Sequence, residues 1–200
     1  MGALLGIVLL LALGVVGLFA FAQFRLSRGT QQVERAWQEH RPPPIADFGT
    51  TRSLTILPLV DWHASRDGLQ TEAGVSYLIQ TDRSTILFDV GENLSSRDPS
   101  PLLHNMKALG IGVDDFDTVV ISHNHLDHVG GRKWAQQRTF SLGNEQIELA
   151  GKRAFTPIPM KYPGLTPVHA ENPTVLAEGV ATTGTISRQL FIGRVEEQAL

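Results

Sequence analysis

Residues 123–128, with the sequence HNHLDH, place three imidazoles and a carboxylate within six positions of one another. Neutral imidazole and ionised carboxylate are the usual protein ligands of zinc and similar divalent ions. Without a cation, four such groups packed together would be crowded and poorly paired. The cluster therefore predicts a metal site, and any fold proposed for this chain has to hold these side chains together.

The flanking residues predict how the cluster is presented. Residues 117–122, DTVVIS, form a β-branched apolar run of strand length, and Gly130 and Gly131 allow the chain to turn sharply soon afterwards. We therefore expect the ligands to lie on a loop that leaves the carboxyl end of a strand.

The spacing within the loop separates two pairs of ligands. His123 and His125 are two residues apart and can close on one ion, while Asp127 and His128 can reach a second ion. Two ions about 3.5–4 Å apart can hold a bridging hydroxide and polarise the bond that it attacks. The loop thus predicts a hydrolytic site with two metal ions.

The pattern His123-x-His125-x-Asp127-His128, preceded by an apolar strand and followed by Gly-Gly, resembles the signature of the metallo-β-lactamase fold superfamily. Residues 85–91, TILFDVG, resemble the strand-Asp-x-Gly motif upstream of the histidines, in which Asp89 would support the metal loop. The order of segments as far as residues 181–188, ATTGTISR, is most similar to the branch that contains dihydropterin ribofuranosylaminobenzene phosphate synthase.

This resemblance, which spans roughly residues 54–188, implies a layered α/β fold, the αββα sandwich. It also implies hydrolysis by metal-bound hydroxide, with Asp127 as the catalytic carboxylate. Two divalent ions, zinc or else manganese or iron, would be held by His123 and His125 and by Asp127 and His128. A transferase that displaces pyrophosphate is an alternative suggested by the pterin-synthase branch, and a non-catalytic metal-binding or scaffold protein is another.

The ligand set expected from the resemblance is unfinished. Members of the superfamily complete the site with a further His, a bridging Asp and a last His from later strands, whereas His169 is the only histidine after His128. His169 is a possible ligand, but its proline-bounded segment, residues 167–173, favours a surface loop. We expect an incomplete sandwich from the amino-terminal part of a longer protein, inactive or nearly so alone; the alternative is a natural short form with a degenerate site.

The amino end is an unbroken run of apolar residues and glycine from position 3 to position 22. At ~1.5 Å per residue a helix of this length spans about 30 Å, the hydrocarbon thickness of a bilayer. The length of the run and the lack of Lys or Arg before it favour a retained anchor, whereas residues 20–22, AFA, fit a signal-peptide cleavage site. Arg25, Arg28, Arg35 and Arg41 follow the run and favour a cytoplasmic domain. Signal cleavage would instead give a periplasmic or secreted protein.

We divide the chain into an anchor over residues 1–24, a stalk helix and Pro-rich linker over 25–52 and the metallo-β-lactamase-like domain over 53–200. Strands are expected over 53–60, 75–79 and 85–88, and Ser100 and Pro101 predict the start of an amphipathic helix that Gly110 stops. The bilayer and a small-molecule substrate are the expected partners. A formal net charge of -3 gives no reason to expect nucleic acid. Lys152 and Arg153 would either meet an anionic group of the substrate or lie on a solvated face.

Overall fold

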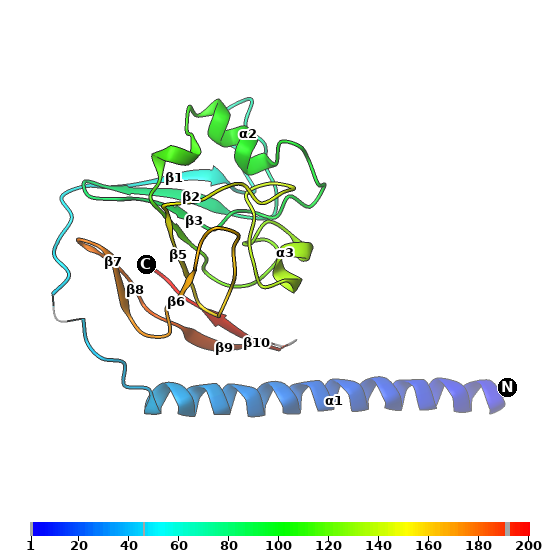
Figure 1. The fold of residues 1–200 in the computed structure, drawn as a ribbon. Helices are drawn as coiled ribbons and strands as arrows, with labels where there is room; N and C mark the ends of the chain where they lie inside the picture. Colours follow the sequence, from blue (N-terminus) through cyan, green and yellow to red (C-terminus); the bar gives the residue numbers. More distant parts are fainter. Residues whose placement is uncertain (1, 46, 191–192) are drawn as a thin grey trace. The chain divides into compact units, whose positions relative to one another are not determined.

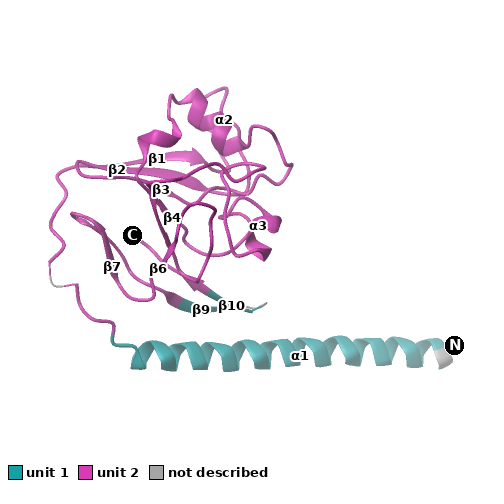
Figure 2. Ribbon diagram, in the orientation of Figure 1, with its two compact units in different colours: residues 1–41, 187–195 teal, residues 42–186, 196–200 magenta. Residues whose placement is uncertain are grey.

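The computed structural model describes residues 2–45, 47–190 and 193–200 (Figure 1). The chain splits into two compact units, residues 1–41 with 187–195 and residues 42–186 with 196–200 (Figure 2). The first unit contains α1 (Gly2–Glu39), most of β9 (Ile186–Leu190) and part of β10 (Gly193–Glu197). The second unit contains the predicted domain with the metal loop.

Helix α1 joins the predicted anchor and the predicted stalk helix into one continuous helix of 38 residues. It ends at Glu39, before Pro42, because proline lacks the N–H and clashes with the preceding turn. The segment Leu4–Glu39 is long and apolar enough to cross a membrane, with a mean hydropathy of 2.9 in its most apolar window and no buried residues there. Signal sequences near an amino terminus share these properties.

A six-stranded mixed sheet in the order β1-β2-β3-β4-β5-β6 forms the centre of the domain (Figure 1). Its first three strands pair antiparallel and its last four strands pair parallel. The carboxyl ends of the four parallel strands therefore lie along one edge of the sheet. The strands are β1 (Leu54–Val60), β2 (Ser76–Thr81), β3 (Thr85–Phe88), β4 (Thr118–Val120), β5 (Arg153–Thr156) and β6 (Val168–His169).

The sheet is covered on both faces, which explains why neighbouring residues of β4, Val119 and Val120, are both apolar and buried. Val119 packs in a core with Leu102 of α2 (Pro101–Ala108) and Trp134 of α3 (Arg132–Gln136). Val120 packs on the other face with Leu176 of the hairpin formed by β7 (Thr174–Ala177) and β8 (Val180–Thr182). A strand buried on both faces needs an unbroken β-branched run rather than an alternating pattern.

The local predictions for the first part of the domain agree with the structure. The expected strand over 53–60 is β1, an edge strand with a register shift between Pro58 and Val60. The Ser100 hydroxyl accepts a hydrogen bond from the Leu103 N–H at the start of α2. Gly110, with a φ of 72°, follows the end of that helix.

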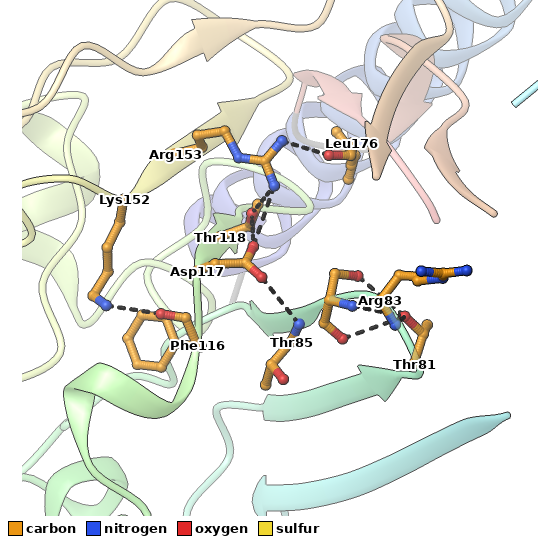
Figure 3. A network of polar contacts seen from close by, with 10 residues as sticks. Thr81, Arg83, Thr85, Phe116, Asp117, Thr118, Lys152, Arg153 and Leu176 are labelled. Carbon is orange, nitrogen blue, oxygen red and sulfur yellow. Dashed lines mark hydrogen bonds and ion pairs between the residues drawn. The ribbon is translucent and has the colours of Figure 1, made fainter. Parts of the chain in front are cut away.

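Lys152 and Arg153 take part in structural contacts at the amino ends of β4 and β5 (Figure 3). Arg153 Nη2 lies 3.2 Å from Asp117 Oδ1, and its Nη1 donates to the Leu176 carbonyl. Lys152 Nζ donates to the Phe116 carbonyl at 2.7 Å. These cations join neighbouring strands at the edge of the sheet opposite the metal loop.

Candidate metal centre

The loop that carries the histidines follows β4 at its carboxyl end, as predicted, and is fixed by backbone hydrogen bonds. The N–H groups of Val90 and Val75 donate to the carbonyls of His128 and Asp127, at 3.0 and 3.2 Å. Gly130 has a φ of 90°, and a Cβ there would lie 2.1 Å from the Ser141 carbonyl oxygen. The glycine after the cluster is therefore required by both conformation and space.

The structure brings three of the four predicted ligands into one group. His123, Asp127 and His128 each offer one ligand atom, and these atoms all lie within 4.8 Å of one another. The His123 ring centroid lies 4.0 Å from that of His128, and 4.6 Å from that of His125 in an edge contact. His125 thus lies against the group without belonging to it.

Asp89 lies directly beneath the two grouped histidines. It follows β3, is only 1% exposed and has a φ of 58°, an uncommon conformation for a residue with a side chain. Its Oδ1 accepts the Ser122 N–H at 2.7 Å, and its Oδ2 lies 2.6 Å from Ser122 Oγ and 2.7 Å from His128 Nδ1. Asp89 thus contacts a predicted ligand, His128, and its role in supporting a bound metal stays a prediction.

Ser122 extends the same network to a second ring. Its hydroxyl has one proton, which Asp89 accepts, and so Ser122 Oγ accepts a hydrogen bond from His123 Nδ1 at 3.0 Å. With Nδ1 protonated in both His123 and His128, each ring keeps the Nε2 lone pair for a ligand. This tautomer, assigned from the network, is the one that zinc-binding histidines adopt. The donor set therefore fits a divalent ion.

The charges of the network shift the pKa values of its members. Burial raises the pKa of the Asp89 carboxyl, against the opposing effect of its hydrogen bonds to His128 and Ser122. Burial acts to lower the pKa of His128, but the hydrogen bond and the charge of Asp89, with the charge of Asp127, outweigh burial and raise it. A metal ion would therefore displace a proton from His128, which makes its binding dependent on pH.

His169 lies on a strand rather than in the loop that we expected. It ends β6, pairs with Thr156 of β5, and its Nε2 lies 3.1 Å from the Pro157 carbonyl oxygen. The parallel pairing with β5 places His169 at the same edge of the sheet as the metal loop, but outside the group of three. Its role as a ligand stays a prediction, as does the catalytic role of Asp127.

Two acidic residues beside the loop, Glu72 and Glu92, are not predicted by the sequence pattern. Glu72 accepts the N–H groups of Glu92 and Asn93 at 2.7 and 2.8 Å. Glu92 itself is 6% exposed, and its carboxylate accepts no hydrogen bond from the described residues. Burial, and then the charges of Glu72 and Asp127, raise the pKa of Glu92. The position of Glu92, directly after the Asp-x-Gly motif, is the sequence signal that pointed to this edge.

Gln198, which the sequence pattern also does not predict, links the carboxyl ends of β4 and β5 by hydrogen bonds. Its side chain is buried, at 4% exposure, and its Nε2 donates to the carbonyls of Ile121 and Phe155 at 2.9 and 3.1 Å. Its backbone N–H donates to the Ser122 carbonyl at 2.9 Å. The segment around Gln198 therefore supports the residue that orients the metal-loop histidines.

Residues 69–141 match the family model of the Metallo-beta-lactamase superfamily. The domain has a metallo-β-lactamase-like fold. The matched segment includes Asp89, Ser122 and the whole metal loop, so the family match and the polar network coincide. The match supports a metal-dependent, hydrolase-like fold.

The chain is similar to two archaeal proteins over part of its length. It is 30% identical over 92 residues to the 7,8-dihydropterin-6-methyl-4-(beta-D-ribofuranosyl)-aminobenzene-5'-phosphate synthase of Methanocaldococcus jannaschii. The aligned segment covers 44% of this chain and 30% of that protein. It is 31% identical over 118 residues to the transcription termination factor FttA of Cenarchaeum symbiosum, which covers 59% of this chain and 15% of that protein. The chain thus spans less than a third of the length of either relative.

Among solved structures, an N-acyl homoserine lactone lactonase aligns with a TM-score of 0.45 and 18% identity, over 74% of this chain and 67% of that chain. A metallo-beta-lactamase from Cronobacter sakazakii aligns with a TM-score of 0.34 and 22% identity, over 65% and 53% of the two chains.

Proposed function

We propose that this protein is a metal-dependent hydrolase whose domain is attached to the membrane by α1. One observation carries the proposal: His123, Asp127 and His128 converge at the carboxyl edge of the sheet, above a buried carboxylate that sets the tautomer of a histidine. Binding of a cation would account for the convergence of these polar side chains, whereas packing of the domain does not require it.

His123 and His125 would hold one divalent ion, and Asp127 and His128 a second, with zinc as the first choice and manganese or iron as alternatives. Bound ions of this kind supply an activated water molecule near neutral pH and a positive charge that polarises the bond under attack. The chain itself orients the rings through Asp89 and Ser122. The substrate would be a small molecule.

Metal analysis of the purified full chain in detergent tests the site. The wild-type chain should retain stoichiometric zinc, manganese or iron, and His123→Ala combined with His125→Ala should abolish this retention. His40→Ala, at the end of the stalk, is the matched control and should retain metal like the wild type. Equal metal content in the double variant and the wild type would overturn the proposed site.

Hydrolysis is tested with phosphodiester, ester and lactone substrates over pH 6–9, with the double variant as the blank. Turnover above the blank supports a hydrolase, whereas metal binding without any turnover favours the non-catalytic alternative. We expect low turnover, because four ligands in one loop give each of two ions only two donors, whereas catalytic zinc sites usually have three. A rate of the order of 1 per second, as in ordinary enzymes, would contradict this expectation of a poorly active chain.

A pterin-type transferase is a second candidate, because 92 aligned residues of this chain are 30% identical to the dihydropterin synthase. The same ions would then bind a pyrophosphate leaving group instead of activating water. Release of pyrophosphate from a substrate that carries it, dependent on an aromatic nucleophile that takes its place and without hydrolysis of the general substrates, would favour this candidate over the hydrolase.

The membrane attachment rests on the exposed apolar face of α1 and on the four arginines that follow the apolar run. A reporter fused at Thr50 should indicate a cytoplasmic location, and the full chain should stay in the membrane fraction. A soluble periplasmic product that begins at Gln23 would show instead that the apolar run is a cleaved signal peptide.

A further inference from the structure

A pocket of about 450 Å³ lies beside the metal loop, between residues 92–96 on one side and residues 126–134 on the other. Its volume is within the range of small-molecule sites, roughly 300–1,000 Å³. Leu126, which lines it, belongs to the metal loop, so the pocket is bounded by that loop, although none of the four predicted ligands lines it. A substrate held there could reach the metal loop.

The walls of the pocket are held by contacts between residues that are distant in the sequence. Asn144 Nδ2 donates to the carbonyls of Ser96 and Arg97 at 3.2 and 3.0 Å, and Asn93 Nδ2 donates to Asn144 Oδ1 at 3.0 Å. The Glu72 carboxylate holds the backbone at the start of the same wall. These bonds fix the shape of the pocket, as a binding site requires.

Two side chains of opposite charge line the pocket, and neither charged group has a hydrogen-bond or ion-pair partner among the described residues. Glu92 as a residue is only 6% exposed, and its carboxylate, which solvent still reaches, accepts no hydrogen bond from the described residues. Arg132 is exposed and makes no ion pair or hydrogen bond with the described residues either, so the two side chains do not pair with each other. A carboxylate on a residue with so little access to water is only partly hydrated, and a hydrogen-bond donor supplied by a ligand would replace the missing water contacts.

The surroundings of each charge favour opposite groups on a ligand. Glu72 and Asp127 add negative charge near Glu92, so a cationic or N–H donor group is favoured at that end. At the other end Lys133, whose Nζ lies 4.0 Å from the centre of the Trp134 ring, adds its charge to that of Arg132. An anion is favoured there, and the guanidinium can bind a phosphate or carboxylate through two hydrogen bonds.

We propose that this pocket binds the part of the substrate next to the reacting bond, and that this part carries an amine or similar N–H donor for Glu92 and a phosphate or carboxylate for Arg132. The inference rests on the proposed function only in assigning the reacting bond to the neighbouring metal loop. It narrows the substrate from any small molecule to one with both a donor group and an acidic group.

The test uses three fluorescent probes of similar size and the full chain in detergent. Pyridoxamine 5′-phosphate carries both groups, pyridoxine 5′-phosphate lacks the amine, and pyridoxamine lacks the phosphate. A chelator is present throughout, so that no metal can bind the phosphate. Fluorescence titration should show the probe with both groups binding about tenfold or more tightly than either of the others, since each charge-assisted hydrogen bond contributes that much or more.

Two substitutions assign the preference to the pocket. Glu92→Gln should make the two phosphates bind equally, and Arg132→Gln should make the two amines bind equally. Lys107→Gln, at an exposed cation of α2, is the matched control and should change neither preference. Thermal unfolding checks that each variant is folded; if Glu92→Gln is not, the exposed Arg132 variant decides alone.

Equal affinity for the three probes, or preferences that persist in both variants, would overturn the inference. Because the chelator removes the ions, this binding assay does not depend on hydrolysis. A negative result would therefore leave the metal-dependent hydrolase standing, and loss of the hydrolase proposal would leave a measured probe preference intact.

Discussion

Replacing Asp89 with asparagine should separate its role at the metal centre from its role in folding. Asparagine has the same shape and keeps Oδ1 as the acceptor for the Ser122 N–H, now at 2.7 Å. The second oxygen, 2.7 Å from His128 Nδ1, becomes an NH₂ group that can only donate. His128 Nδ1 must then accept, and the proton of the neutral ring moves to Nε2, the atom that would bind the ion.

Loss of such a supporting partner typically costs 10–100-fold in metal affinity, or about 1.4–2.8 kcal/mol. Asp89→Asn should therefore bind zinc at least tenfold more weakly than the wild type while unfolding at a similar temperature. Asp89→Ala should do more damage, because it leaves the Ser122 N–H and the His128 ring without acceptors. Breaking a buried charged pair of this kind costs about 3–5 kcal/mol of stability.

Metal affinity is measured by competition with a chromophoric chelator, and stability by thermal unfolding of the metal-free chain. Asp117→Asn is the matched control, since it changes the same residue type in a half-exposed ion pair with Arg153 at the opposite edge of the sheet. Such surface pairs contribute about 0–1 kcal/mol, and zinc affinity should not change. Unchanged zinc affinity in Asp89→Asn would refute the argument that this carboxylate sets the tautomer of His128.

Three further predictions follow from the same edge of the sheet. Ser122→Ala should weaken zinc binding about tenfold in the chelator competition, because His123 Nδ1 loses its acceptor. Ser122→Thr, which keeps the hydroxyl, should bind zinc like the wild type. Equal loss of zinc affinity in both variants would contradict the role of the hydroxyl. In the wild type the folded pKa of Glu92 is raised above its unfolded value of about 4.5, so stability falls as pH rises through the folded pKa. Glu92→Gln should therefore unfold at a higher temperature than the wild type at pH 8, with the difference vanishing below pH 4.5, and an equal difference at both pH values would show another cause. Gln198→Ala should lower the free energy of unfolding by about 2–4 kcal/mol in urea, because the Ile121 carbonyl loses this donor, the Phe155 carbonyl keeps only the Ile121 N–H, and Thr182 loses its acceptor. The exposed Gln136→Ala should have little effect, and similar values for the two variants would contradict this.

The sequence predicted the parts of the site that are local in the chain. The strand before the metal loop, the turn after it and Asp89 all follow from runs of a few residues with a clear period or a glycine. The same is true of α2, where Ser100 and Pro101 mark the start. The strand, the turn and the helix agree with the structure because each is determined mostly by its own residues, whereas the role of Asp89 stays a prediction.

The missed parts depend on contacts between distant segments. Gln198 reaches Ile121 across 77 positions of sequence, and nothing around Gln198 marks it as buried. Strand β6 has only two residues, too few to show a period, and so His169 was expected in a loop. Ser122 lies next to the histidines in the sequence, but its importance comes from Asp89, which is 33 positions away.

Departures from ordinary local rules gather at the carboxyl edge of the sheet. Asp89 has an unfavourable backbone conformation, and the carboxylate of Glu92, three positions later, accepts no hydrogen bond from the described residues although Glu92 is only 6% exposed. Burial alone does not explain why the Glu92 carboxylate accepts no hydrogen bond from the described residues. Asn105 is at least as buried, and its side-chain amide donates to the carbonyls of Leu59 and Gln70. Nor does the fold lack a cation for Glu92, because Arg132 lines the same pocket. A carboxylate that pairs with a guanidinium within the chain keeps fewer acceptor sites and less net negative charge for a donor group of a ligand. Binding of a ligand therefore explains the separation of Glu92 from Arg132 better than folding does. Selection for stability alone would favour pairing of these two charges.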